Sequence, residues 1–192
     1  MAAMPRWKPD ARARLIVAAV ELFAENGYEN TTVVEIAERA ALTKSTFFRH
    51  FPDKREVLFG GDAVSTVLAD AIEAMPAGYS ARDVIAAALD AVGRETFTPE
   101  TREFSARRRA VIAASTELRE REALKGLSLT AAMSDGLTRR GVPRLAARIS
   151  AEFGALALDL AYERWSAPEC EDVFAIVARR ALDEVYAARA EC

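Results

Sequence analysis

The chain has 192 residues, of which 51% are hydrophobic and 29% are charged, a balance that is typical of globular proteins and excludes a disordered chain. The net charge of −3 excludes a uniformly basic nucleic-acid-binding protein. Residues 1–59 nevertheless carry nine Lys and Arg against eight Asp and Glu, so a local basic surface near the N-terminus stays open.

Apolar residues recur with the 3.6-residue period of helices along the chain, and no segment alternates like a strand. The sequence therefore predicts an all-α fold of about nine helices. The first is expected over residues 10–26 and ends at Gly27, a frequent left-handed capping position. The second follows Thr32, which forms a capping box with Glu35.

A third, short helix is expected over residues 44–50, capped by Thr43. A second capping box opens a fourth helix over residues 53–75, which the pair Gly60-Gly61 can bend. Proline and glycine breaks separate five more helices, expected over residues 80–94, 99–115, 117–140, 143–165 and 171–189.

The second and third helices, joined by a tight turn, have the arrangement of a helix-turn-helix, in which the second of the two enters the major groove of DNA. Phe47 and Phe51 point the same way at 100° per residue and are expected to anchor this helix in the core. The opposite face carries hydroxyls, a guanidinium and an aromatic ring, which suit phosphate, guanine and thymine-methyl contacts. The residues expected to contact DNA are Thr32, Thr43, Lys44, Ser45, Thr46, Phe48, Arg49, His50 and Lys54.

The same region resembles the DNA-binding domain of the TetR family of repressors. The resemblance lies in residues 19–28, 31–37, 42–51 and 53–58, which read AVELFAENGY, TTVVEIA, LTKSTFFRHF and DKREVL. Three positions depart from the family's usual form. Ala41 stands where the turn often has Gly, Ser45 stands where Gly is common in the recognition helix, and Phe48 replaces a frequent Tyr.

The resemblance implies a three-helix DNA-binding domain at residues 1–56 and a larger helical domain at residues 57–192 that binds a small molecule and dimerises. It implies that the protein binds a palindromic double-stranded DNA operator as a homodimer. Such a regulator is usually a repressor, which the small molecule releases from the DNA. The segment 104–124 also faintly resembles regulators of the mycofactocin type, whose effectors are acyl-CoA thioesters.

Dimerisation is expected through the last two helices, because each carries an apolar stripe longer than a domain of this size needs for itself. The residues of these two stripes are Leu145, Ile149, Phe153, Leu156 and Leu160, and Val173, Val177, Ala181 and Val185.

Alanines on the inner faces of the helices at 80–94 and 99–115 leave room for an apolar ligand pocket. Arg108 lies near the centre of the apolar face of its helix. It binds an anionic group of the ligand or, alternatively, forms a structural ion pair, for example with Glu117. The effector is thus expected to be apolar, and acidic if Arg108 meets it. The expected pocket residues are Phe97, Phe104, Arg108, Ile112 and Trp165.

No enzyme motif is present: the chain lacks GxSxG, a P-loop, GxGxxG and HExxH. His50 is the only histidine, so it forms neither a metal cluster nor a triad by itself. We therefore expect no enzyme, no metal and no cofactor. A helical adaptor that binds other proteins without ligand control is the alternative to a DNA-binding regulator, and retardation of DNA in a gel separates the two.

The expected place of the protein is the cytoplasm. No stretch of about 18 uncharged apolar residues predicts a membrane span, and residues 1–10 lack the apolar run of a secretory signal. The cysteines, Cys170 and Cys192, lie in no metal-binding spacing. We expect them to be free thiols in a reducing compartment.

Overall fold

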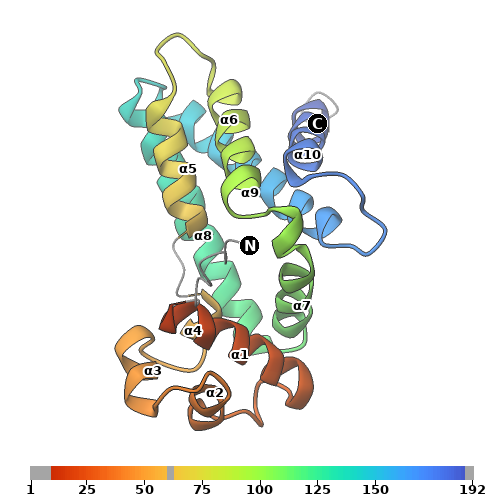
Figure 1. Cartoon of the computed structure of the whole chain (residues 1–192). Helices are drawn as coiled ribbons and strands as arrows, with labels where there is room; N and C mark the ends of the chain where they lie inside the picture. The colour runs from red at the N-terminus through yellow and green to blue at the C-terminus, as the bar shows by residue number, and fades with distance from the viewer. Residues whose placement is uncertain (1–9, 60–62, 189–192) are drawn as a thin grey trace, which may run out of the picture. The chain divides into compact units, whose positions relative to one another are not determined.

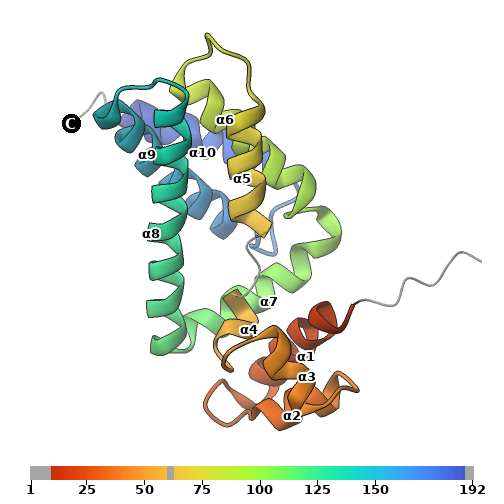
Figure 2. The same ribbon diagram turned by 90° about the vertical axis from the view of Figure 1, so that its left-hand side faces the viewer.

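A computed structural model describes residues 10–59 and 63–188, which contain helices and loops and no strand (Figures 1 and 2). The predicted all-α fold is confirmed. By their internal contacts these residues form two compact units. One contains the described residues up to 59 together with residues 107–119, and the other contains residues 63–106 and 120–188. The division predicted from the sequence, at residue 56, differs from these units because it places residues 107–119 in the C-terminal domain.

The first unit contains four helices in succession and the corner between two later ones. The four are α1 (Ala11–Asn26), α2 (Val33–Arg39), α3 (Lys44–His50) and α4 (Glu56–Phe59). The corner consists of the end of α7 and the start of α8, and its side chains Val111, Ile112 and Leu118 are buried. This unit therefore combines segments that lie far apart in the sequence.

The remaining elements follow the predicted order closely. They are α5 (Ala63–Ala74), α6 (Ala81–Glu95), the 3₁₀ turn η1 (Pro99–Thr101), α7 (Arg102–Ala113), α8 (Thr116–Arg139), α9 (Arg144–Trp165) and α10 (Phe174–Ala188). The predicted fourth helix corresponds to α4 and α5 together. The bend expected at Gly60-Gly61 lies outside the described residues.

The predicted helix starts are made by side-chain caps. Thr32 and Glu35 form a reciprocal capping box, and Thr43 accepts a hydrogen bond from the backbone N–H of Thr46. Ser80 caps α6 in the same way. Since each cap satisfies a backbone donor that a helix start leaves unpaired, the sequence determines these boundaries locally.

The core of the second unit forms where α5, α6, α9 and α10 pack together. Alanines on α9 let its neighbours approach closely, and Gly154 is required there because a Cβ at this position would lie 2.8 Å from Cγ2 of Ile85. The fully buried large side chains of this core include Leu68, Ile72, Ile85, Leu89, Trp165 and Phe174. None of the described helices is both long and apolar enough to cross a bilayer.

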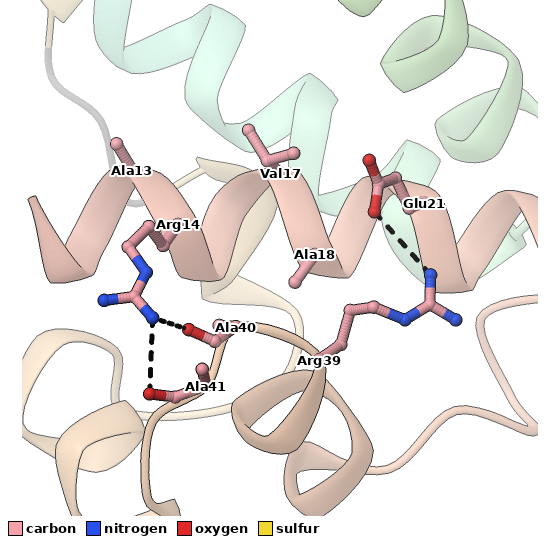
Figure 3. A pocket seen from close by; sticks show the side chains of 8 residues that line it. All are labelled: Ala13, Arg14, Val17, Ala18, Glu21, Arg39, Ala40 and Ala41. Atoms are coloured by element: carbon pink, nitrogen blue, oxygen red, sulfur yellow. Dashed lines mark hydrogen bonds and ion pairs between the residues drawn. The ribbon is translucent and has the colours of Figure 1, made fainter. Parts of the chain in front are cut away.

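The turn between α2 and α3 contains the one described non-glycine residue with a left-handed backbone, Ala41, at φ +51°. Arg14 on α1 holds this turn by donating hydrogen bonds to the carbonyl oxygens of Ala40 and Ala41, as Figure 3 shows. The same residues line a hollow of about 290 Å³ between α1 and the turn. The backbone therefore requires, at Ala41, the conformation that glycine adopts most easily.

We predict that Ala41→Gly stabilises the protein by about 0.5–1 kcal/mol, because relief of the left-handed strain exceeds the added flexibility of the unfolded chain. The urea midpoint of unfolding should rise. Ala40→Gly is the matched control: Ala40 has an ordinary right-handed backbone at φ −76°, so this change should lower the midpoint. Equal losses in the two variants would show that the turn carries no strain.

Candidate DNA-binding surface

The short helix α3 is fixed from behind by two aromatic side chains. Phe47 is 0% exposed and Phe51 is 1% exposed, and their ring centroids lie 5.5 Å apart. Ile36 of α2 is also fully buried. The prediction that Phe47 and Phe51 face the core is confirmed, and the opposite face of α3 is left for solvent or a partner.

The outer face of α3 presents charge, hydroxyl and aromatic groups side by side. Lys44, Ser45 and Arg49 are exposed. The ring of Phe48 is 48% exposed, and Nζ of Lys44 lies 6.0 Å from its centroid. The exposed phenylalanine ring suits contact with a thymine methyl group, and the two cations suit contact with phosphate oxygens or a guanine edge.

The hydroxyls expected to contact DNA are partly used within the protein. The hydroxyl oxygens of Thr43 and Thr46 lie 3.0 Å apart, and Thr43 also caps the helix. The hydroxyl of Thr32 donates to Glu35 at 2.7 Å. Thr32 and Thr43 are exposed at the helix starts while Thr46 is half-buried.

Two basic residues expected at this surface are turned partly inward. Nζ of Lys54 donates to the carbonyl oxygen of Tyr28 at 2.7 Å and lies 4.1 Å from the Tyr28 ring. It therefore braces the loop between α1 and α2. His50 is half-buried, and its Nε2 is buried without a hydrogen-bond partner among the described residues.

The structure adds a cation that the sequence pattern did not single out. The guanidinium of Arg12, on the first turn of α1, lies 5.4 Å from the ring of Phe51 at the C-terminal end of α3. The signal was present as a basic residue at the start of α1. Its place beside α3 depends on the packing of α1 against α3, which a linear pattern does not contain.

Glu117, on the corner between α7 and α8, contacts the loop between α1 and α2 and the segment before α4. Its Oε1 accepts a hydrogen bond from the hydroxyl of Tyr28 at 3.1 Å and lies 3.5 Å from a guanidinium nitrogen of Arg55. Burial raises the pKa of the Tyr28 hydroxyl well above its usual value of 10.0, and the charge and hydrogen bond of Glu117 raise it further. Arg108 donates from Nε to the carbonyl oxygen of Leu58 at 3.1 Å.

The raised pKa of Tyr28 predicts a loss of stability at alkaline pH. The folded protein holds this proton more tightly than the unfolded chain does, so its contribution is complete below pH 10.0, the usual tyrosine pKa, and falls as pH rises beyond it. Tyr28→Phe should cost about 0.5–1.5 kcal/mol at pH 7, and the gap to wild type should narrow above pH 10. Tyr79→Phe is the control, since Tyr79 is 55% exposed; if both variants follow the same pH profile, Tyr28 is not the group responsible.

The expected ligand-pocket residues are divided between the two units. Phe97 and Trp165 meet in the second unit, with ring centroids 5.7 Å apart, and Phe174 lies 4.8 Å from Phe97. Phe104 is half-buried in the same unit. Arg108 and Ile112 belong to the first unit, with the helix-turn-helix.

The fold and surface together define a helical protein with an N-terminal helix-turn-helix. Residues 15–59 match the sequence model of the bacterial regulatory proteins, tetR family, so the resemblance predicted for this segment is confirmed. The regulator TcmR of Streptomyces glaucescens is 43% identical over 82 residues, which cover 42% of this chain and 36% of TcmR. The repressor Rv3405c of Mycobacterium tuberculosis is 32% identical over 91 residues, 47% of each chain. The chain thus spans less than half the length of each of these relatives.

Solved structures resemble the whole fold at low sequence identity. The TetR-family repressor FadR of Thermus thermophilus, in complex with lauroyl-CoA, has a TM-score of 0.56 and 24% identity, covering 91% of this chain and 93% of that one. SmeT in complex with triclosan has a TM-score of 0.61 and 21% identity, covering 93% and 90%. At these identities the likeness shows the fold.

Proposed function

We propose that this protein is a transcriptional regulator that binds a specific DNA sequence through α3. The observation that carries the proposal is the two-faced character of this helix: Phe47 is fully buried, while Lys44, Ser45 and Arg49 are exposed. A helix-turn-helix needs such a rigid short helix with a polar outer face. The match of residues 15–59 to the tetR family supports the same function.

In this proposal the residues on and around α3 have distinct tasks. Arg49 reads a guanine edge in the major groove, and Phe48 contacts a thymine methyl. Lys44, at the start of α3, contacts phosphate. Thr32, Ser45 and His50 contact the phosphate backbone of the DNA from the edges of this surface. Lys54 holds the loop between α1 and α2 through the carbonyl oxygen of Tyr28.

Arg49→Ala should weaken binding by on the order of 1–3 kcal/mol if the guanidinium reads a base, and Lys44→Ala should lower the salt dependence of log Kd by roughly one phosphate. The measurement is fluorescence anisotropy with a duplex selected from a random library, at several salt concentrations. Arg94→Ala removes the same charge from an exposed position on α6 and should leave both quantities unchanged. Wild-type binding by Arg49→Ala would contradict the assignment.

We further propose a homodimer in which α9 provides the main contact. Leu145, Ile149 and Leu156 are 71%, 43% and 48% exposed and lie on one face of α9. The expected stripe on α10 needs correction, because Val177, Ala181 and Val185 are buried in the core of their own chain. The exposed apolar residues here are Val173, just before α10, and Ile176 on its first turn.

Leu156→Glu should convert the dimer to a monomer, because it places a carboxylate in an apolar contact. Light scattering at micromolar concentration should give wild type twice the chain mass of 20.9 kDa and the variant a single mass. Leu127→Glu is the matched control, since Leu127 is 67% exposed on α8; it should remain a dimer. A monomeric wild type, or a dimeric Leu156→Glu variant, would refute the role of α9.

The C-terminal part, residues 57–192, is proposed to dimerise and to bind a small apolar effector that releases the DNA. The aromatic rings of Phe97, Tyr162, Trp165 and Phe174 gather at one end of its core, and aromatic side chains are common in the lining of ligand sites. The ligands in the FadR and SmeT structures support ligand control. In this proposal the protein has no catalytic activity and works in the cytoplasm, where the DNA is.

A further inference from the structure

Trp165 at the end of α9 is fully buried, yet its indole nitrogen Nε1 is buried without a hydrogen-bond partner among the described residues. A buried N–H without an acceptor destabilises a protein, because the group loses its hydrogen bond to water and gains none in exchange. The ring itself is well packed, since Phe97 and Phe174 both lie 5.7 Å from it, centroid to centroid. The indole ring is therefore well packed, but its N–H still lacks a hydrogen-bond acceptor.

A second donor of the same kind lies beside it. The guanidinium of Arg102, at the start of α7, lies 5.2 Å from the Trp165 ring, and its Nε is likewise buried without a partner among the described residues. Its two terminal nitrogens donate to the carbonyl oxygens of Cys170 and Asp172. The carboxylate of Asp172 is paired with Arg180 at 2.6 Å. Arg102 thus binds neutral carbonyl oxygens through its terminal nitrogens, and its Nε is left without an acceptor among the described residues.

The loop that Arg102 holds also borders an open space. Cys170 and Asp172 line a hollow of about 470 Å³ between the end of α9, the loop and α10, together with Arg164, Ala167, Glu169, Val177, Arg180 and Glu184. Figure 1 shows this loop leaving the end of α9 before α10 begins. Arg102 therefore binds the loop that borders this hollow and also contacts the aromatic cluster at Trp165.

From these contacts we infer that Arg102 and Trp165 form the polar end of the effector site and bind a carboxylate, and that the apolar body of the same ligand enters beside the rings of Phe97, Tyr162 and Phe174. Two N–H donors, one of them on a cation, favour an anionic oxygen over a neutral one. The inference rests on the proposed ligand control and names the ligand class. It assigns to Arg102 the role that the sequence suggested for Arg108, whose Nε donates to the carbonyl oxygen of Leu58 in the first unit.

The test measures binding of decanoic acid and decan-1-ol, without DNA, by the fluorescence of Trp165. Trp7, the only other tryptophan, is changed to Phe so that Trp165 is the sole reporter. Decanoic acid should change the emission saturably and bind about tenfold more tightly than decan-1-ol, as expected for one charge-assisted hydrogen bond. Equal affinity for the two compounds, or no response to either, would overturn the inference.

Two variants separate binding from folding. Arg102→Met should weaken decanoic acid about tenfold and leave decan-1-ol unchanged. Arg82→Met is the matched control, because Arg82 also lies over an aromatic ring, 5.1 Å from Tyr186, and it should bind both compounds like wild type. Because Arg102 also braces the loop, a second variant, Trp165→Phe, removes only the indole N–H and keeps an aromatic ring. Its binding is measured by calorimetry, and its affinity should fall for decanoic acid and stay unchanged for decan-1-ol.

If Arg102→Met and Trp165→Phe both bind decanoic acid as wild type does, the two donors do not form the site. This result would leave the DNA-binding proposal intact, because no measurement here involves DNA. Conversely, a protein that binds decanoic acid through Arg102 but retards no DNA would contradict the proposed regulator and not the site.

Discussion

A helix of seven residues is too short to be stable by itself in water, so α3 exists only because the core holds it. Phe47 and Phe51 supply this anchor, with 0% and 1% of their surface exposed. Everything proposed for the DNA surface depends on this packing, since the direction of Phe47 fixes the opposite direction of Lys44, Ser45 and Arg49. Loss of the anchor would remove the helix before any DNA contact was changed.

Side chains before and after α3 hold the segments that flank this helix. Arg14 of α1 binds the carbonyl oxygens of the turn before it. Lys54, after it, binds the carbonyl oxygen of Tyr28, and the hydroxyl of Tyr28 donates to Glu117 on the corner between α7 and α8. The unit that contains the helix-turn-helix therefore includes residues 107–119.

Much of this architecture was predictable because its signals are local. Caps such as Thr32 with Glu35 and periodic apolar residues set the helices within a few positions, and the spacing of Phe47 and Phe51 identified the buried face of α3. The features that sequence reasoning missed depend on contacts between distant segments. Arg12 beside Phe51, Lys54 at Tyr28 and Arg102 beside Trp165 each join residues that no linear pattern brings together. The buried stripe of α10 was misassigned for the same reason, because its apolar period fits an internal helix contact as well as a dimer.

The central claim, that two copies of α3 bind successive major grooves, is tested most directly by hydroxyl-radical footprinting on a duplex selected from random DNA. The account predicts two protected segments related by two-fold symmetry, with centres one helical turn or about 34–36 Å apart, or a whole multiple of that distance. A single protected segment, or uniform weak protection along the duplex, would contradict it.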